Sequence, residues 1–219
     1  CQILDQSLTL WYTGVKMDGQ ILQAIGILKK GGIVAFPTDT VYGLGANAFN
    51  DSAVLRVYQA KCRPHHLALP LLLADISQIT TVARDVPKIA WQLAECFLPG
   101  GLTMVLYKSS SVSTLITGKS NKIAVRVPSH PTPIVLIEGL GVPITGTSAN
   151  LTGSPSPLTA EEVYNQMGKR VDLIIDGECP GGIASTVIDL TGESPMILRE
   201  GAISGEDIER ACGALIRKG

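Results

Sequence analysis

Three cationic side chains stand in long stretches of the sequence that contain no acidic residue. Lys61 and Arg63 fall between Ser52 and Ala74, and Arg126 falls within residues 96–137. Cations in acid-free segments favour an anionic ligand such as a phosphate, a carboxylate or a nucleic-acid backbone. The alternative is that these charges are solvated and that their acidic partners lie elsewhere in the sequence. Charge alone does not decide between the two.

The pair Lys61 and Arg63 stands at the end of a predicted helix, just before Pro64, which we expect to stop that helix. Lysine supplies a point charge and arginine a planar fork, and together they suit the oxygens of a phosphate. The helix dipole alone also favours cations at this end, so a purely structural role stays open.

Arg126 occupies a predicted strand, on the same face as Ala124. An arginine inside an apolar strand is either a surface residue or a paired charge that faces a ligand. Arg199, near the end of another predicted strand, poses the same question.

Two segments rich in hydroxyl groups complete the candidates. In residues 36–45 a buried strand runs into Thr38 and Thr40, followed by glycines that would let backbone approach a ligand closely. Residues 141–150 nearly match the phosphate-loop pattern, but Thr147 stands where the lysine must be, which excludes that loop. What remains there is a set of uncharged hydrogen-bonding groups on Thr147, Ser148 and Asn150.

Metal-binding and nucleophile motifs are missing from the sequence. It has no HExxH pair and no GxSxG elbow, and His65 and His66 are adjacent, so they would point apart if extended. We therefore predict neither a protein metal site nor a covalent nucleophile.

Alternating helix and strand signals must position these residues. Helices are predicted over 20–30, 52–61 and 86–97, and from capping boxes at Thr159 and Ser204. Pro64 and the Pro99–Gly101 run are expected helix stops. Strands are predicted over 33–36, 69–73, 102–107, 122–127, 142–145, 173–176, 185–190 and 196–199. This alternation, without an internal repeat, predicts one α/β domain over residues 1–219 with a large twisted sheet.

Composition narrows the class of protein. Of 219 residues, 45% are hydrophobic and 17% charged, with a net charge of −1, which excludes a disordered chain. No apolar run approaches the ~20 residues of a membrane span, and no signal peptide opens the chain, so we expect a cytoplasmic protein. Five scattered cysteines without a CxxC pair favour buried free thiols over disulfides or a zinc ribbon.

Taken in order, the motifs resemble the YrdC family of L-threonylcarbamoyladenylate synthases in its single-domain form. The segments that carry this resemblance span almost the whole chain: 37–45 (PTDTVYGLG), 61–64 (KCRP), 99–103 (PGGLT), 124–128 (AVRVP), 147–150 (TSAN), 185–187 (STV) and 198–201 (LREG). The resemblance implies an α/β fold: a twisted open mixed sheet with flanking helices and a large concave basic cavity.

It also implies an activity. Family members join L-threonine, bicarbonate or CO₂, and ATP into threonylcarbamoyl-AMP and release pyrophosphate, with Mg²⁺ accompanying ATP. Downstream tRNA threonylcarbamoyl-transferase proteins would then modify tRNA, and weak RNA binding by this chain would be compatible with that role.

Residue roles follow from the same resemblance. Lys61 and Arg63 would be the catalytic pair that contacts phosphate. L-Threonine would be bound by Thr38, Thr40, Arg126 and Ser185. The nucleotide would be bound by Lys61, Arg63, Thr147, Ser148, Asn150 and Arg199. Leu72 stands where the family usually has a histidine that contacts the amino-acid pocket.

Two other functions remain as alternatives. The acid-free basic stretches suit a non-enzymatic RNA-binding module, although only 5% of residues are aromatic and so able to stack on bases. A related chemistry, seen in hydrogenase maturation proteins, makes a carbamoyl adenylate from carbamoyl phosphate, but within a much longer chain.

Overall fold

The structure is a computed structural model, and it describes residues 19–213 and 216–218. The helices are α1 (Gly19–Lys29), α2 (Asp51–Lys61), α3 (Ile79–Val82), α4 (Lys88–Phe97), α5 (Pro131–Leu140), α6 (Ala160–Met167) and α7 (Gly205–Cys212), with 3-10 turns at η1 (Ile76–Gln78) and η2 (Gly168–Arg170). The strands are β1 (Val34–Phe36), β2 (Gly43–Gly45), β3 (Leu71–Leu72), β4 (Leu102–Tyr107), β5 (Lys122–Arg126), β6 (Ile144–Thr145), β7 (Thr147–Ser148), β8 (Leu173–Ile174), β9 (Thr186–Asp189), β10 (Met196–Arg199) and β11 (Arg217–Lys218).

The strands form two open sheets rather than the one large sheet predicted. The smaller has the order β7-β2-β1-β8, and the larger has the order β11-β10-β9-β4-β5-β3-β6. Both mix parallel and antiparallel pairs: β8 runs parallel to β1, for example, whereas β5 runs antiparallel to β4. The mixed open α/β architecture is therefore confirmed, and the single sheet is corrected to two.

The sheets meet where the chain passes from β6 to β7 through Gly146. A Cβ atom on Gly146 would lie 2.3 Å from Cγ of Leu72, so only glycine lets the chain turn here. An isolated antiparallel bridge between Asn47 and Ile144 ties the end of β2 to β6. The hydroxyl groups of Thr147 and Ser148 consequently lie at the junction of the two sheets.

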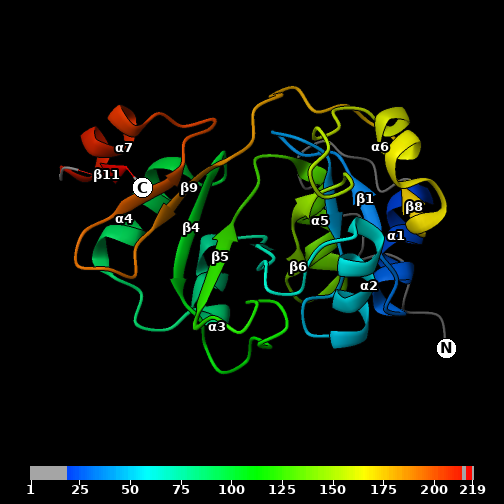
Figure 1. Cartoon of the computed structure of the whole chain (residues 1–219), viewed down its shortest axis with the longest axis horizontal. Coiled ribbons are helices and arrows are strands. Elements are labelled where there is room, and N and C mark those ends of the chain that lie inside the picture. Colours follow the sequence, from blue (N-terminus) through cyan, green and yellow to red (C-terminus); the bar gives the residue numbers. More distant parts are fainter. Residues whose placement is uncertain (1–18, 214–215, 219) are drawn as a thin grey trace, which may run out of the picture.

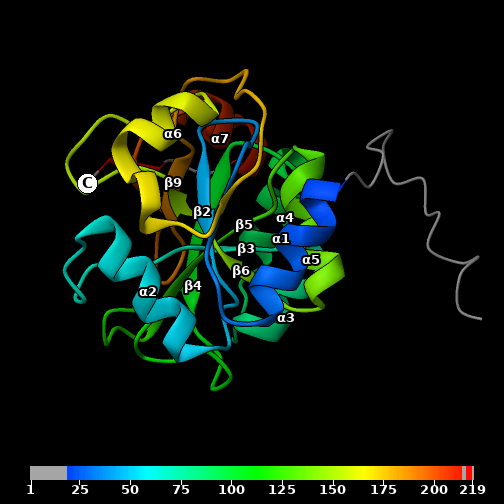
Figure 2. The same ribbon diagram turned by 90° about the vertical axis from the view of Figure 1, so that its right-hand side faces the viewer.

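Helices cover the outer faces of both sheets. In Figure 1, β4, β5 and β9 with α4 and α7 form one half of the molecule, and β1 with α1, α2 and α6 forms the other. Figure 2, turned by 90°, shows α1 and α5 side by side on one flank, with α2 and α6 on the opposite flank. No helix in the described ranges is long and apolar enough to cross a membrane.

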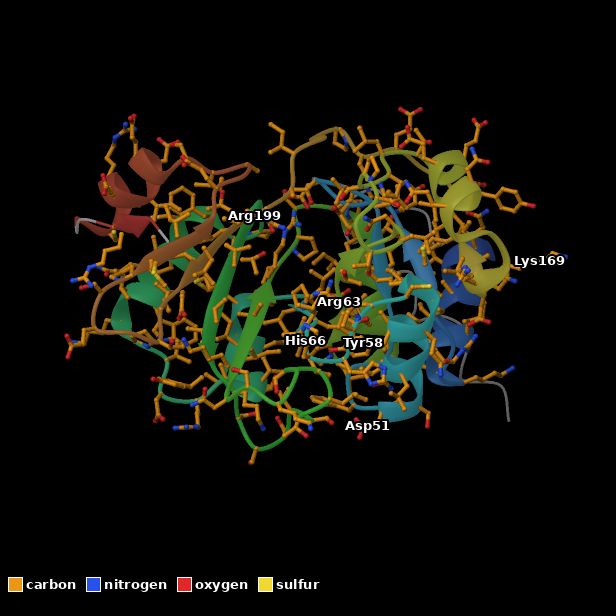
Figure 3. All side chains as sticks on the ribbon, viewed as in Figure 1. Asp51, Tyr58, Arg63, His66, Lys169 and Arg199 are labelled. Carbon is orange, nitrogen blue, oxygen red and sulfur yellow. The ribbon has the colours of Figure 1, made fainter. Side chains whose placement is uncertain are left out.

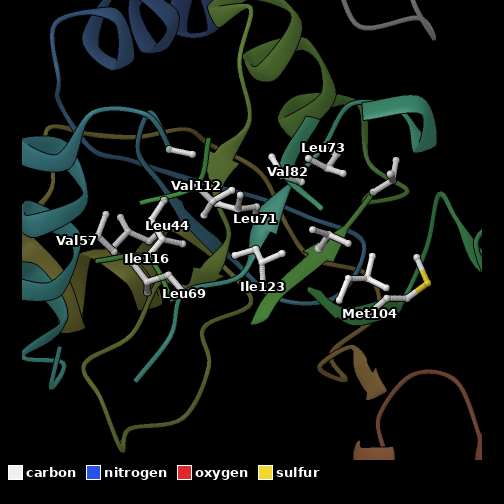
Figure 4. Packing of buried hydrophobic residues seen from close by; sticks show 14 of the residues in the cluster. Leu44, Val57, Leu69, Leu71, Leu73, Val82, Met104, Val112, Ile116 and Ile123 are labelled. Carbon is white, nitrogen blue, oxygen red and sulfur yellow. The ribbon is translucent and has the colours of Figure 1, made fainter. Parts of the chain in front are cut away.

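Apolar side chains from both halves fill the interior. One cluster runs from β2 through β3, β4 and β5, and Figure 4 shows Leu44, Leu71, Ile123 and Met104 along it. A second cluster lies under α1 and α5 around Phe36. Helices cover the outer side of both clusters. The polar groups of the candidate motifs lie elsewhere, between the two halves.

Gly43 and Gly45 serve the core rather than a ligand. A Cβ atom on either glycine would lie 2.7 or 2.6 Å from the ring of Phe36, which is fully buried on the neighbouring strand. The prediction that these glycines admit a ligand is therefore wrong, because the aromatic ring occupies the space that their missing side chains leave.

The helix caps follow the sequence closely. The Oγ1 of Thr159 accepts a hydrogen bond from Glu162 N, and the Oγ of Ser204 accepts one from Asp207 N, as the capping boxes predict. Helix α2 ends at Lys61 as predicted, but the residue that terminates it is Cys62, with φ of 51°, and not Pro64. The cation pair therefore straddles a left-handed turn.

Some elements are not apparent from the sequence. Helix α5 carries Pro131 and Pro133 in its first turn and Gly139 near its end, which hide its apolar spacing. Strands β2 and β7 are short: β2 has glycine on both sides of Leu44, and β7 consists of Thr147 and Ser148. Among the described cysteines, Cys179 is buried, but Cys62 and Cys96 are exposed free thiols, which corrects the expectation that all are buried.

Candidate functional site

A cavity of about 300 Å³ lies between the two halves. Its lining comes from both sheets and from the loops around them. The lining residues are Thr40, Val41, Arg63, Pro70, Leu72, Thr103, Ala124, Arg126, Gly146, Thr147, Ser148, Ser156, Ala184, Ser185, Val187 and Arg199. Figure 3 shows Arg63 and Arg199 in the gap between the halves, each coming from a different side.

The charged residues that line the cavity are all arginines. They are Arg63, Arg126 and Arg199, and no Asp or Glu is among the sixteen lining residues. The remaining polar lining consists of hydroxyl groups. Such a set favours an anionic ligand with many oxygen atoms.

Arg126 is the most constrained of the three. Its Nε donates to the backbone oxygen of Gly100 (2.8 Å), Nη1 donates to Oγ1 of Thr40 (2.7 Å), and Nη2 donates to Oδ1 of Asp39 (2.6 Å). Burial lowers the pKa of Arg126, and the Asp39 carboxylate opposes that shift. The guanidinium is thus held in one orientation by partners from two separate segments.

The turn after β1 presents one threonine to the cavity and keeps the other behind it. Thr38 Oγ1 donates to the backbone oxygen of Val41 (2.8 Å) and accepts from Thr40 N (3.1 Å), while Oγ1 of Thr40 faces Arg126. Thr38 shapes the turn, and Thr40 lines the cavity.

Residues 175–185, which connect β8 to β9, form what we call the crossing segment. It passes from one half to the other above the gap in Figure 1. Gly182 N donates to the backbone oxygen of Thr40 (2.9 Å), and Tyr42 Oη donates to the carbonyls of Ile175 and Gly177. These hydrogen bonds tie the crossing segment to the turn after β1.

Lys61 lies under the loop after β7 instead of in the cavity. Its Nζ donates to the backbone oxygens of Ser148 (2.5 Å) and Asn150 (2.8 Å) and to Oδ1 of Asn150 (3.0 Å). The residue is 2% exposed, and burial, with a smaller contribution from Arg63, lowers its pKa from 10.5 to about 7. Three acceptors match the three N–H groups of an ammonium, which favours the charged form against burial.

Arg63, unlike Lys61, lines the cavity, and it does so from the loop after α2. Its Nε and Nη2 donate to the backbone oxygens of Leu67 (3.1 Å) and Ala68 (2.8 Å), so the loop after α2 holds one edge of the guanidinium. Burial lowers its pKa. The other edge is available to a ligand.

Ser185 and Arg199 lie together at the third wall. Nη2 of Arg199 donates to the backbone oxygen of Ser185 (2.7 Å), and Oγ of Ser185 lies 2.8 Å from Oγ1 of Thr103. Thr103 belongs to the predicted Pro99–Thr103 motif but received no role from the sequence. Its position on β4, parallel to β9, is what brings it to Ser185.

Seven of the ten predicted site residues line the cavity. They are Thr40, Arg63, Arg126, Thr147, Ser148, Ser185 and Arg199. The other three, Thr38, Lys61 and Asn150, are buried directly behind it and hold the lining loops. The sequence could not show which predicted residues line the cavity and which lie behind it, because that depends on packing between segments far apart in the chain.

Leu72 lines the cavity with Pro70, Ala124 and Val187, which give it an apolar part. In the sequence, Leu72 is a departure from the family pattern and has no predicted role. Its 3% exposure and its contact with Gly146 make it part of the cavity floor.

Comparison with known proteins identifies the family. The family model Sua5_yciO_yrdC, described as "Telomere recombination", matches residues 26–201. The chain belongs to the Sua5/YciO/YrdC family. Threonylcarbamoyl-AMP synthase of Pyrococcus abyssi (strain GE5 / Orsay) is 44% identical over 199 residues, which cover 90% of this chain and 58% of that protein. A putative threonylcarbamoyl-AMP synthase of Mycobacterium tuberculosis (strain ATCC 25618 / H37Rv) is 36% identical, covering 88% of this chain and 89% of the relative.

A solved structure of the same family has the same fold. P. abyssi Sua5 complexed with L-threonine superposes with a TM-score of 0.88 at 44% identity, covering 91% of this chain and 58% of that one. The chain thus spans just over half the length of the Pyrococcus relative, and it matches a family member that has a bound amino acid.

A resident metal site does not fit the side chains of the described residues. No group of three or more His, Cys, Asp or Glu lies together there that could hold an ion. The cavity lining itself has no carboxylate or imidazole.

Proposed function

We propose that this chain synthesises threonylcarbamoyl-AMP from L-threonine, bicarbonate or CO₂, and ATP, with release of pyrophosphate, as a step toward threonylcarbamoyl-adenosine in tRNA. The observation that carries the proposal is the cavity itself. All seven motif segments contribute residues to its lining, with three arginines, several hydroxyls and no acidic lining residue. The P. abyssi relative named for this activity, and its structure with L-threonine, support the same reading.

The reaction needs charge compensation more than a nucleophile. The neutral amine of threonine adds to CO₂ and loses a proton, or displaces water from bicarbonate, to give an N-carboxylate. A carboxylate oxygen then attacks the α-phosphorus of ATP while pyrophosphate leaves. Both reactants are anions, so their approach requires fixed cations. Arg63, Arg126 and Arg199 face one space of limited volume and would supply that compensation.

The hydrogen-bond partners of the lining residues suggest which part of the cavity would bind threonine and which would bind the nucleotide. Arg126, with Thr40 on one terminal nitrogen, offers a fork for the threonine carboxylate, and Ser185 adds a hydroxyl. Arg63, Arg199, Thr147 and Ser148 would bind the nucleotide, with Lys61 and Asn150 holding their loop from behind. Positioning of this kind supplies most of the rate where no covalent intermediate forms.

Magnesium would enter with its substrate. Because Mg²⁺ is commonly bound through substrate phosphates and retained waters, ATP can carry the ion without a protein cage. The ion would neutralise phosphate charge, and this chain's arginines would orient the rest.

The test is a substrate-omission assay. Purified protein is incubated with Mg²⁺, ATP, L-threonine and bicarbonate, and pyrophosphate and threonylcarbamoyl-AMP are measured. We expect product only when all three substrates are present. Pyrophosphate release that ignores both threonine and bicarbonate would refute the proposal, and product formed from carbamoyl phosphate instead would assign the alternative adenylate chemistry. Tight, salt-sensitive RNA binding without any adenylate would assign the RNA-binding alternative.

A further inference from the structure

Asp39 is an acidic residue beside the cavity for which the sequence analysis offered no role. It belongs to the turn after β1, and its Oδ1 accepts from Nη2 of Arg126 at 2.6 Å. The two side chains are 17% and 8% exposed, so both charges are largely withdrawn from water. Such a pair is costly unless both charges are compensated.

Both members of this pair retain unused hydrogen-bonding capacity. Within the described ranges, Oδ2 of Asp39 receives no hydrogen bond. The one fully buried side-chain polar atom without a partner there is Oε1 of Gln166, so Oδ2 of Asp39 is not fully buried and can be reached. Arg126 uses Nε, Nη1 and Nη2 once each. A guanidinium has five N–H groups, so two remain for a ligand.

An α-amino acid needs this combination of charges. It carries a carboxylate and an ammonium on one carbon atom, so a site that binds both must offer a cation and an anion a few ångströms apart. Arg126 and Asp39 meet that requirement at a distance of 2.6 Å. The cavity lining itself contains no acid, so Asp39, held beside it by Arg126, is the carboxylate that we consider for the ammonium.

We propose that Asp39 accepts a hydrogen bond from the ammonium group of the amino-acid substrate while Arg126 binds its carboxylate. This inference rests on the proposed function and deepens it by naming the residue that recognises the substrate amine. In the substrate-free protein the ion pair satisfies both charges, and the arriving zwitterion adds its own charges to the pair without replacing either member.

The arrangement makes Asp39 a specificity residue. A ligand with a hydroxyl in place of the ammonium, 2,3-dihydroxybutanoate, keeps the carboxylate but loses the charge that Asp39 pairs with. A hydrogen bond to a charged group is worth enough that wild-type protein should bind L-threonine about 10- to 100-fold more tightly than this analogue. The ratio of the two affinities is the quantity that reports on Asp39.

The experiment is calorimetric titration of L-threonine and of 2,3-dihydroxybutanoate into wild-type protein, Asp39→Asn and Asp39→Glu. Asp39→Asn keeps an oxygen for Arg126 but removes the charge, so the affinity ratio should collapse toward one. Asp39→Glu should restore part of it. The matched control is Glu178→Gln, which removes an exposed charge from the crossing segment and should leave the ratio unchanged.

The outcomes separate the two proposals. An unchanged ratio in a folded Asp39→Asn protein would overturn the role of Asp39 and leave the synthase proposal intact. If that variant fails to fold, wild-type protein alone decides, because equal binding of both ligands would overturn the inference. Wild-type protein that binds no L-threonine would overturn both proposals.

Discussion

Arg126 shows how one side chain links the two halves of the site. Its three hydrogen bonds reach Gly100, Thr40 and Asp39, which belong to different segments. A lysine at this position could keep the charge but not the fork, because a single ammonium cannot satisfy three partners arranged around a plane.

Replacement of Arg126 by lysine should therefore lower the rate of adenylate formation about 100-fold or more, since at least two charge-assisted hydrogen bonds are lost. Pyrophosphate release at saturating ATP measures this, and circular dichroism checks the fold. Lys122→Ala is the matched control, because Lys122 lies on the same strand but pairs with Asp189 outside the cavity lining. Near-normal activity in Arg126→Lys would contradict the assigned role.

Lys61 lies outside the cavity lining, although its motif predicts a phosphate contact. The sequence predicts a phosphate contact, but in the structure the ammonium is buried against the loop of Ser148 and Asn150, and the backbone oxygen of Lys61 also accepts from Thr152 N. We expect Lys61 to act on a bound nucleotide through this loop. Loss of its side chain removes the ammonium donor from the backbone oxygens of Ser148 and Asn150, whereas Oδ1 of Asn150 keeps its hydrogen bond from Oγ of Ser148.

The Lys61→Met variant should lose stability as well as at least tenfold in activity, because the loop that presents Ser148 is released. Denaturant unfolding and pyrophosphate release measure the two effects. The exposed Lys30→Met serves as control and should change neither quantity. Full stability combined with lost activity would instead support a direct phosphate contact.

The pH dependence of stability gives a second test of Lys61. In the unfolded chain this lysine binds a proton up to its ordinary pKa of 10.5, but in the folded protein only up to about 7. Between these values the unfolded state holds more protons, so the free energy of unfolding rises with pH in this window. The difference between wild type and Lys61→Met should therefore grow from pH 7 toward pH 10 and be flat below pH 7. A difference that stays constant throughout would show that the three acceptors cancel the effect of burial.

At the scale of elements, the crossing segment and the turn after β1 depend on close backbone approach. A Cβ atom on Gly181 would lie 2.2 Å from the backbone oxygen of Asp39, and backbone cannot give way as a flexible side chain can. The crossing segment, which lines the cavity through Ala184 and Ser185, thus packs directly against the turn that carries Asp39 and Thr40.

Gly181→Ala should push the crossing segment away from that turn and weaken L-threonine binding about tenfold, with ATP binding changed less. Titration of each ligand measures this. Gly26→Ala is the control: it lies in α1 with nothing within 4 Å of its Cβ position, so it should leave both affinities unchanged and stabilise the helix by up to about 1 kcal/mol. Equal weakening by both variants would argue against a specific role for the segment.

The described part of the molecule is two sheet-and-helix halves with the cavity between them, joined by the β6–β7 turn and the crossing segment. A ligand that contacts both halves should stabilise the complete fold. At concentrations about 100-fold above their dissociation constants, L-threonine and Mg²⁺-ATP should each add about 2.7 kcal/mol, which raises Tm by roughly 5–10 °C in a domain of this size.

Chelation separates a resident metal from one carried by ATP. EDTA should leave the Tm of the ligand-free protein unchanged and should abolish both pyrophosphate release and the ATP-dependent rise in Tm. A drop in Tm of the ligand-free protein on chelation would reveal a metal site among residues outside those that the structure describes.

The sequence by itself determined the local features. It predicts the helix caps at Thr159 and Ser204 and the apolar strands β4 and β10, because caps and strand periodicity depend on neighbouring residues. It also supplies the residue types of the motifs. Only the tertiary structure decided that the strands form two sheets, that Phe36 fills the space at Gly43 and Gly45, and that Lys61 stands behind the cavity that Arg63 lines. The Asp39–Arg126 pair also appears only there, since 87 residues separate its members and packing alone brings them together.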